Sequence, residues 1–172
     1  MPRNLLLTIG LFLLSACSSD DNLERGDHPY VFHLIQASLW DKAMENNETY
    51  FPPTYEVDGF THGTSNPDKL LNVANHFYPD VEGDWYCLKM TVESLAATGV
   101  KTIFEGTAPV GDKQPDFDGA DDELFPHIHG GIHPDAVLEV HRVMRGADGT
   151  FLSIEGVTTL SLIHISEPTR PY

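Results

Sequence analysis

The chain has 172 residues, which is enough for one domain of ordinary size. Acidic residues number 26 against 10 basic ones, giving a formal charge of −16, so the chain offers no continuous positive surface for a phosphate backbone and no nucleic-acid partner is expected. With 41% apolar residues and a mean hydropathy of −0.22, it can bury a modest core but is not a multi-span membrane protein.

The first 17 residues are typical of a secretory signal that ends in a cysteine. Arg3 supplies a positive start, an apolar run follows, and Leu14-Ser15-Ala16-Cys17 places small residues before the cysteine. This pattern resembles a bacterial lipoprotein signal, which implies removal of residues 1–16, acylation of Cys17 and anchoring in the lipid bilayer. Ser18 implies the outer membrane of the cell envelope, facing the periplasm. An ordinary signal peptide is the alternative. Residues 17–29 are expected to consist of the lipidated cysteine followed by a solvated tether.

Short strands and helices alternate after this head. The segment from Tyr30 to Ile35 is rich in aromatic and aliphatic residues and predicts a first strand, in which His33 shares a face with Val31 and Ile35. Ser38 then predicts the cap of a helix that ends at the pair Asn46-Asn47.

Asn66-Pro67-Asp68 predicts the start of a second helix, because it combines a capping amide, a proline at the first helical position and an acid in the first turn. Pro79 closes this helix. The segment from Trp85 to Val92 predicts a strand whose apolar face contains Tyr86, Leu88, Met90 and Val92. Cys87 lies in this strand and is expected to be a buried structural cysteine rather than a nucleophile.

The second half of the chain predicts further short elements. A turn or short helix is expected from Glu93 to Thr98, and strands are expected from Val100 to Glu105, Ala136 to Val143 and Phe151 to Ile154. Residues 106–123 combine early glycines and prolines with many aspartates and contain almost nothing to bury, which predicts a mobile acidic loop. The order of elements predicts an α+β domain with helices outside a sheet.

Three clusters each contain a histidine: Phe32-His33-Leu34 in the first predicted strand, Gly59 to Thr64, and Leu124 to Gly130. The second and third place it beside glycines or a proline. A single strand histidine is more often a hydrogen-bonded structural group than a catalyst. Taken together, the clusters place imidazoles where loops approach ligands. They predict that His33, His62 and His127 line one common pocket.

The arrangement of motifs across the chain is distinctive. It consists of Phe32-His33, Gly59-Phe60-x-His62-x-Thr64, Asn72-x-Ala74-Asn75-x-Phe77, Phe104-Glu105 and Leu124-Phe125-Pro126-His127-Ile128-x-Gly130, followed by Asp135-Ala136-Val137. These motifs resemble, in order, the bacterial family called domain of unknown function 952. The resemblance runs from about Tyr30 to Val143.

This resemblance implies a domain over residues 30–159 with an ADP-ribosyltransferase-like split β-sandwich, short flanking helices and a cleft for a nucleotide-like ligand such as NAD or ADP-ribose. By position, it implies that His33 holds a ribose, that His62 and Thr64 lie near the nicotinamide, and that Glu105 or His127 polarises the reacting ribose. The candidate catalytic residues are therefore His33, His62, Glu105 and His127. The candidate substrate-binding residues are Phe60, Gly63, Thr64, Phe125 and Gly130.

Two other functions stay open at this point. His127, His129, His133 and Asp135 offer a set that zinc would accept, although Pro126 and Pro134 interrupt regular geometry. A lipid-anchored domain that binds a small ligand or an envelope protein, without chemistry, is the other alternative. Arginine is scarce, so a pyrophosphate would need backbone amides or one of Arg25, Arg142 and Arg145.

The end of the chain differs from the rest. Residues 160–170 resemble the translation of a transposase adapter used to prepare sequencing libraries. The resemblance implies that residues 160–172 are foreign and that the natural C-terminus is missing after Thr159. A genuine terminal strand is the alternative, because Leu160, Leu162 and Ile163 are apolar.

Overall fold

The structure is a computed structural model that describes residues 26–158. The predicted signal, the lipid anchor at Cys17 and the adapter-like tail lie outside these residues, so they stay predictions. Within residues 26–158, none of the helices has the length and apolar character that crossing a membrane requires.

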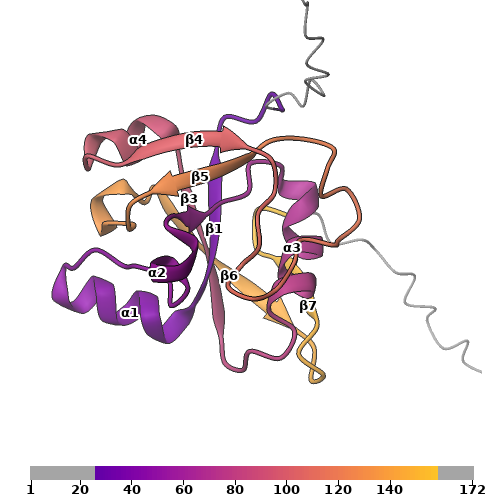
Figure 1. Ribbon diagram of the computed structural model, residues 1–172. Helices are drawn as coiled ribbons and strands as arrows, with labels where there is room; N and C mark the ends of the chain where they lie inside the picture. Colours follow the sequence, from indigo (N-terminus) through magenta and orange to yellow (C-terminus); the bar gives the residue numbers. More distant parts are fainter. Residues whose placement is uncertain (1–25, 159–172) are drawn as a thin grey trace, which may run out of the picture.

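Two antiparallel sheets form the frame of the domain (Figure 1). The larger sheet has the order β1-β3-β6-β7, with β1 at Val31–Gln36, β3 at Trp85–Met90, β6 at Glu139–Arg145 and β7 at Phe151–Ile154. The smaller sheet has the order β2-β5-β4, with β2 at Thr61–His62, β5 at Phe125–His129 and β4 at Lys101–Glu105. The predicted α+β class is confirmed.

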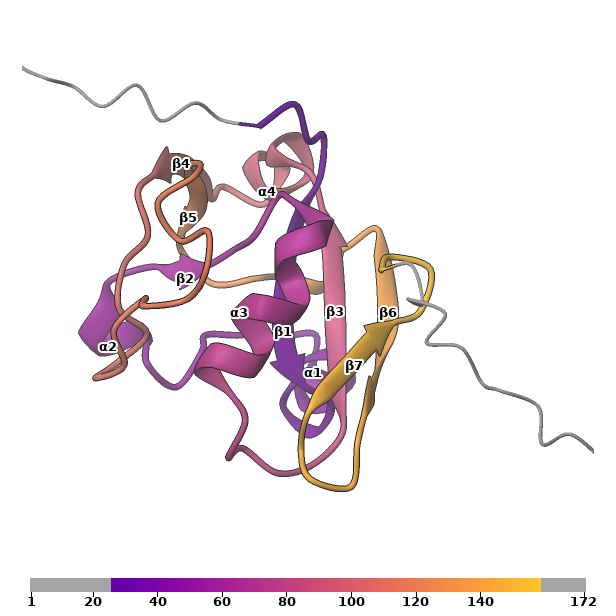
Figure 2. The ribbon, with the colours of Figure 1, turned by 90° about the vertical axis from the view of Figure 1, so that its right-hand side faces the viewer.

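Short helices flank these sheets. They are α1 (Ala37–Asn46), α2 (Tyr55–Asp58), α3 (Leu70–Phe77) and α4 (Val92–Ala97), together with 3₁₀ turns η1 (Pro67–Lys69) and η2 (Pro134–Ala136). Figure 2 shows α3 lying across β1 and β3, with the smaller sheet to one side. The predicted cap at Asn66 is present, since its side chain accepts the Asp68 backbone N–H at 3.0 Å.

The two strands β1 and β3 of the larger sheet are buried on both faces, whereas β6 is largely exposed. On one face an apolar core joins the sheet to α1 and α4 through Val31, Ile35, Trp40, Leu88, Met90 and Leu95. On the other face α3 covers a second core that contains Phe32, Leu34, Leu70, Ala74, Cys87 and Phe151. The prediction of a single apolar face on the Trp85 strand is therefore incomplete, because Trp85 and Cys87 are buried on the opposite face.

A narrow seam joins the two sheets. Phe32 of β1 and Thr64 exchange two backbone hydrogen bonds of 2.8 and 2.9 Å, and the N–H of Gly63 donates to the carbonyl of Pro126 in β5 at 2.9 Å. Pro126 therefore lies inside a strand, contrary to the expectation that it breaks regular geometry. A Cβ on Gly63 would lie 3.0 Å from Pro126 and 3.1 Å from Val31, so any larger residue would have to displace these neighbours.

Several boundaries differ from the predictions. Helix α1 begins two residues before the expected position, and its N-cap, Gln36, makes no side-chain capping bond. Strand β6 begins at Glu139 rather than Ala136, because Pro134–Ala136 forms a 3₁₀ turn whose N-cap, His133, accepts the Asp135 backbone N–H at 3.2 Å. The short helix α2 was not predicted, although it supplies a residue of the site described below.

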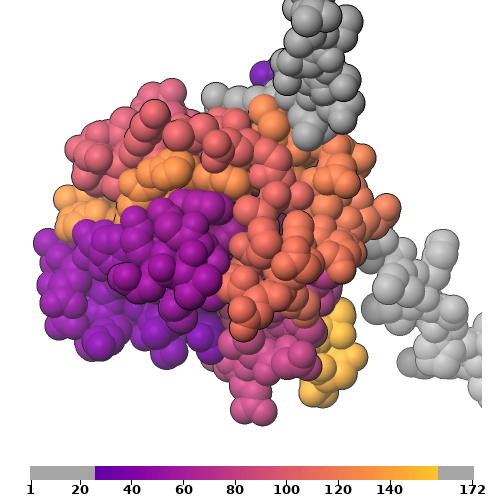
Figure 3. Space-filling model, in the orientation of Figure 1, coloured from indigo at the N-terminus to yellow at the C-terminus, as the bar shows by residue number. Residues whose placement is uncertain are grey.

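The acidic segment 106–123 packs against the domain. The prediction that it contains almost nothing to bury is therefore wrong. Phe117 packs edge-on against Phe77 and Phe125, with ring centroids 5.9 and 6.0 Å apart, and Ala120 is buried. The space-filling view shows this orange-red segment lying beside the purple segment that contains α2 (Figure 3).

Replacing Gly63 tests the seam. Gly63→Ala is expected to lower the free energy of unfolding by about 1–3 kcal/mol, because the new methyl group overpacks against the β5 backbone. Gly106→Ala is the control, since a Cβ there meets no atom within 4 Å. Urea unfolding should show a lower midpoint for Gly63→Ala alone, and equal midpoints would contradict the close approach.

Cys87 offers a second test of burial. Its thiol is fully buried, and burial raises its pKa, so little thiolate forms near neutral pH. Iodoacetamide should leave the Cys87 peptide unlabelled in the native protein and label it in guanidinium chloride, as read by peptide mass spectrometry. Rapid labelling in the native state would contradict the structural role.

Candidate functional site

His33 stands at the seam between the sheets. Its Nδ1 lies 2.7 Å from the backbone carbonyl of His62, which can only accept, so Nδ1 carries the proton and donates. The lone pair therefore resides on Nε2, which is buried and has no hydrogen-bond partner among residues 26–158. Burial lowers the pKa of His33 to about 4, so the ring is neutral at neutral pH.

His127, in the central strand of the smaller sheet, has a similar arrangement. Its Nδ1 donates to Oε2 of Glu105 at 3.0 Å, and its Nε2 is buried without a partner among the described residues. The ring of Phe60 stacks on the imidazole at a centroid distance of 3.9 Å. Burial lowers the pKa of His127, against the opposing effect of Glu105, whose side chain is 53% exposed.

His62 is held by a buried carboxylate. Helix α2 ends at Asp58, Gly59 turns the chain in a left-handed conformation with a φ of 78°, and the Asp58 Oδ2 atom then lies 3.1 Å from Nε2 of His62. The Asp58 side chain is only 3% exposed, and its other oxygen accepts the backbone N–H of Gly111 at 3.0 Å. Burial still lowers the pKa of His62, so a neutral ring with its proton on Nε2 results.

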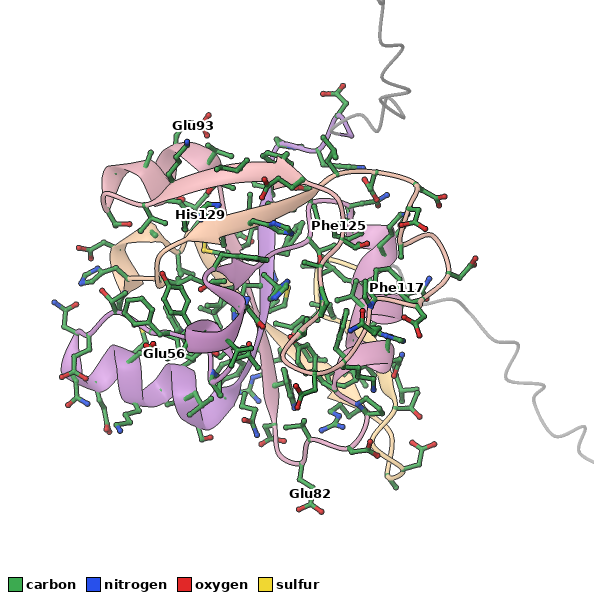
Figure 4. The ribbon with its side chains drawn as sticks, viewed as in Figure 1. Glu56, Glu82, Glu93, Phe117, Phe125 and His129 are labelled. Carbon is green, nitrogen blue, oxygen red and sulfur yellow. The ribbon has the colours of Figure 1, made fainter. Side chains whose placement is uncertain are left out.

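The three imidazoles line one cavity, which we term the histidine cavity. Thr64, Gly63 and Phe125 line it as well. Its remaining walls come from three parts of the chain. These are β1, through Phe32 and Leu34; α3 and the following residue, through Val73, Phe77 and Tyr78; and the acidic segment, through Thr107, Ala108, Val110 and Phe117. Figure 4 shows Phe125 at the start of β5 and Phe117 beside α3.

The histidine cavity is small. The space open to the centres of water-sized spheres is about 40 Å³, whereas one water needs about 10–15 Å³ by this measure and pockets for drug-sized ligands measure about 300–1,000 Å³. A hydroxyl or amino group fits among the imidazoles, but a nucleotide does not fit there as a whole.

A second, larger space adjoins it, which we term the apolar chamber. It measures about 260 Å³ and shares five lining residues with the histidine cavity: His33, Leu34, Phe77, Tyr78 and Val110. Its other walls include Leu39, Tyr50, Pro52 and Trp85. His33 is thus the imidazole that faces both spaces.

Other predicted site residues lie elsewhere. Glu105 and Phe60 do not line the histidine cavity, but each contacts His127 from behind. Gly130 does not line it either, since a Cβ there would meet Val100 at 3.0 Å and its carbonyl accepts from the Thr61 hydroxyl. Substrate contact by Glu105, Phe60 or Gly130 therefore has no support in this geometry.

The expected zinc set does not form a cluster. Within residues 26–158, no group of three or more His, Cys, Asp or Glu side chains is arranged to hold a metal ion. His127 turns toward Glu105 and Phe60, while His133 lies 3.4 Å from Asp135 near η2. The described residues therefore do not assemble the alternative metal site at His127, His129, His133 and Asp135.

One of the predicted phosphate partners, Arg145, is engaged away from the cavity, and Arg142 does not line it. Arg145 donates to the backbone carbonyls of Pro79, Val81, Gly83 and Gly149. Among the described residues that line the histidine cavity or the apolar chamber, there is no lysine or arginine. A pyrophosphate in either space would depend on backbone amides.

The sequence-based prediction of the site omitted Asp58, which holds His62. Asp58 lies four residues before His62, and a glycine between them turns the chain. This spacing could have indicated a contact between the two side chains. The walls from α3 and the acidic segment carried no such signal, because they reach the cavity only through tertiary packing.

Comparison with known proteins fits this picture. Residues 34–140 match the family described as "Protein of unknown function (DUF952)". The chain belongs to the DUF952 family. No curated protein matches it. The crystal structure of protein CC0527 from Caulobacter crescentus has a similar fold, with a TM-score of 0.53 and 16% identity over 71% of this chain and 92% of that chain. A double mutant of CC0527 aligns over the same shares, with 16% identity and a TM-score of 0.54.

The neutral histidines predict a pH dependence of stability. Unfolded His33 takes up a proton near pH 6.5, whereas the folded ring stays neutral to about pH 4. Its stabilising effect is therefore complete above pH 6.5 and decreases as the pH falls toward 4, by roughly 3 kcal/mol in total. The lowered pKa values of His62 and His127 act in the same direction.

Urea unfolding across this pH range measures the effect. His33→Gln can keep a donor for the His62 carbonyl but cannot titrate, so it should flatten the loss of stability. His129→Gln, on the exposed end of β5, should change the pH dependence much less, because His129 acts on His127 and is not itself a buried ring. Identical pH profiles for His33→Gln and the unaltered protein would contradict a buried neutral His33.

Proposed function

We propose that this DUF952 domain binds a small molecule whose O–H or N–H groups enter the histidine cavity. One observation carries the proposal: the Nε2 atoms of His33 and His127 are buried acceptors without a partner among residues 26–158. A buried acceptor left unpaired costs about 1–3 kcal/mol. A donor group on a ligand would recover that free energy at each nitrogen.

The charges around the cavity favour a neutral or cationic donor group. The imidazoles present lone pairs, and the nearest ionisable partners are the carboxyl groups of Asp58 and Glu105. An anion in this space would meet acceptors and no lysine or arginine side chain of the described lining. Acetate and phosphate are therefore expected to bind worse than alcohols or amines of similar size.

The resemblance to ADP-ribosyltransferases supports a nucleotide-like ligand as a second candidate. The hydroxyl groups of a ribose would supply the donors that His33 and His127 lack. The pyrophosphate would find no cationic side chain in the described lining, which makes a whole NAD or ADP-ribose less well supported. The split β-sandwich relation, the envelope location and the bilayer anchor stay proposals beside it.

Acid–base chemistry is compatible with the same geometry. An imidazole whose second nitrogen is oriented by a carboxylate is the arrangement of a general base, and His127 with Glu105 has that form. The lone pair on Nε2 would accept a proton from a bound hydroxyl or amine. Binding is the primary proposal, because it requires only the unpaired nitrogens.

The test follows the imidazole nitrogens directly. Long-range ¹H–¹⁵N spectra of the protein would be recorded with ethanol, ethanolamine, acetate, inorganic phosphate, ADP-ribose and NAD. Ethanol and ethanolamine should shift the Nε2 resonances of His33 and His127, because a donor hydrogen-bonds to each lone pair. His127→Leu should remove the response at that position, while His129→Leu, on the same strand, should keep it.

Two results would change the conclusion. If neither ethanol nor ethanolamine shifts an imidazole nitrogen, the histidine cavity does not bind donor groups. If ADP-ribose or NAD shifts these nitrogens and ethanol does not, the nucleotide-like ligand replaces the present proposal.

A further inference from the structure

The size of the histidine cavity limits what can reach its nitrogens. About 40 Å³ admits a hydroxyl or amino group, so the rest of any larger ligand must lie outside it. The apolar chamber is the adjoining space, and it meets the histidine cavity at His33, between Leu34, Phe77 and Tyr78. A ligand body in the chamber therefore lies next to His33, whose Nε2 has no partner among the described residues.

The walls of the chamber favour an apolar body. Leu39, Tyr50, Pro52 and Trp85 line it, and they contribute mainly aliphatic and aromatic surface. Among its polar groups, the side chain of Gln36 already donates to the carbonyl of Glu82 at 3.0 Å, while Nε1 of Trp85 is buried without a partner among the described residues. Water gains few partners on such walls, whereas an apolar group is well accommodated.

The volume sets the size of that body. An apolar cavity of about 150 Å³ holds a benzene molecule. The chamber measures about 260 Å³, which is enough for one six-membered ring with a short substituent.

From these observations we infer that the ligand is amphipathic: a ring-sized apolar body occupies the apolar chamber, and an alcohol or amine at one end reaches His33. This inference rests on the proposed function and names the class of ligand for the same site. The carboxyl group of Asp58, held behind His62, makes the polar end better suited to an ammonium than to a carboxylate.

A ligand series of matched size tests the inference without altering the protein. Benzyl alcohol and benzylamine carry a ring and a donor, toluene carries the ring alone, benzoate replaces the donor by an anion, and ethanol carries a donor without a ring. Calorimetric titration and the imidazole ¹⁵N shifts give affinity and location together. Benzyl alcohol is expected to bind about 100-fold more tightly than ethanol, since a ring buried in the chamber contributes as a buried apolar side chain does.

A pair of variants on α1 locates the ring. Leu39 lines the chamber and is partly buried, so Leu39→Trp should fill it and reduce the affinity for benzyl alcohol at least tenfold while ethanol still shifts the His33 nitrogen. Met44 is 51% exposed on the same helix, and Met44→Trp should leave both ligands unaffected. Circular dichroism checks that each variant is folded.

Each outcome distinguishes the two proposals. If ethanol shifts the imidazole nitrogens and benzyl alcohol binds no more tightly, the amphipathic ligand is wrong while donor binding stands. If toluene or benzoate binds as tightly as benzyl alcohol, the donor at His33 has no role and the inference is overturned. If no member of the series shifts an imidazole nitrogen, donor binding itself fails.

Discussion

The hydrogen bond from Nδ1 of His33 to the backbone of His62 is the interaction on which the rest of the site depends. It crosses the seam between the two sheets, beside the backbone pair of Phe32 and Thr64. Because a carbonyl accepts and never donates, this bond fixes the tautomer and leaves the lone pair on Nε2. The fold therefore determines both the position and the chemical character of this buried, unpaired nitrogen. Gly63 allows this seam, since any side chain there would press on β5.

One carboxyl group, at the end of α2, links the seam to the acidic segment. Asp58 accepts from His62 with one oxygen and from the backbone of Gly111 with the other. The same segment is held to α3, where His76 donates to the carbonyl of Gln114 at 2.6 Å and Phe117 packs on Phe77. The cavity wall formed by the acidic segment and the orientation of His62 are thus linked. A change in the position of this segment would alter both.

Local signals allowed much of the frame to be predicted from sequence. Alternation placed His33 on the face of Val31 and Ile35, and the Asn66 cap gave the start of the α3 region, because each depends on neighbours in the chain. Contacts between residues far apart in the sequence could not be predicted from such local signals. The packing of residues 106–123, the pairing of Pro126 within β5 and the separation of His133 from His127 all arise from tertiary contacts. A composition rich in aspartate could indicate a loop, but not that its few apolar residues would close a cavity.

The two carboxyl groups of the site cannot have equivalent roles, and burial explains the difference. Asp58 is almost wholly buried and uses both oxygens, so its charge acts at short range on His62 with little screening by water. Glu105 is about half exposed, so solvent weakens its effect on His127, and burial of the ring outweighs it in lowering the pKa of His127. The family resemblance directed attention to Glu105, yet the structure makes it an orienting group behind His127. A proton received by His127 would be stabilised only modestly by Glu105, whereas the neutral ring is already the form that accepts a donor. This balance favours recognition of a donor group over transfer of its proton.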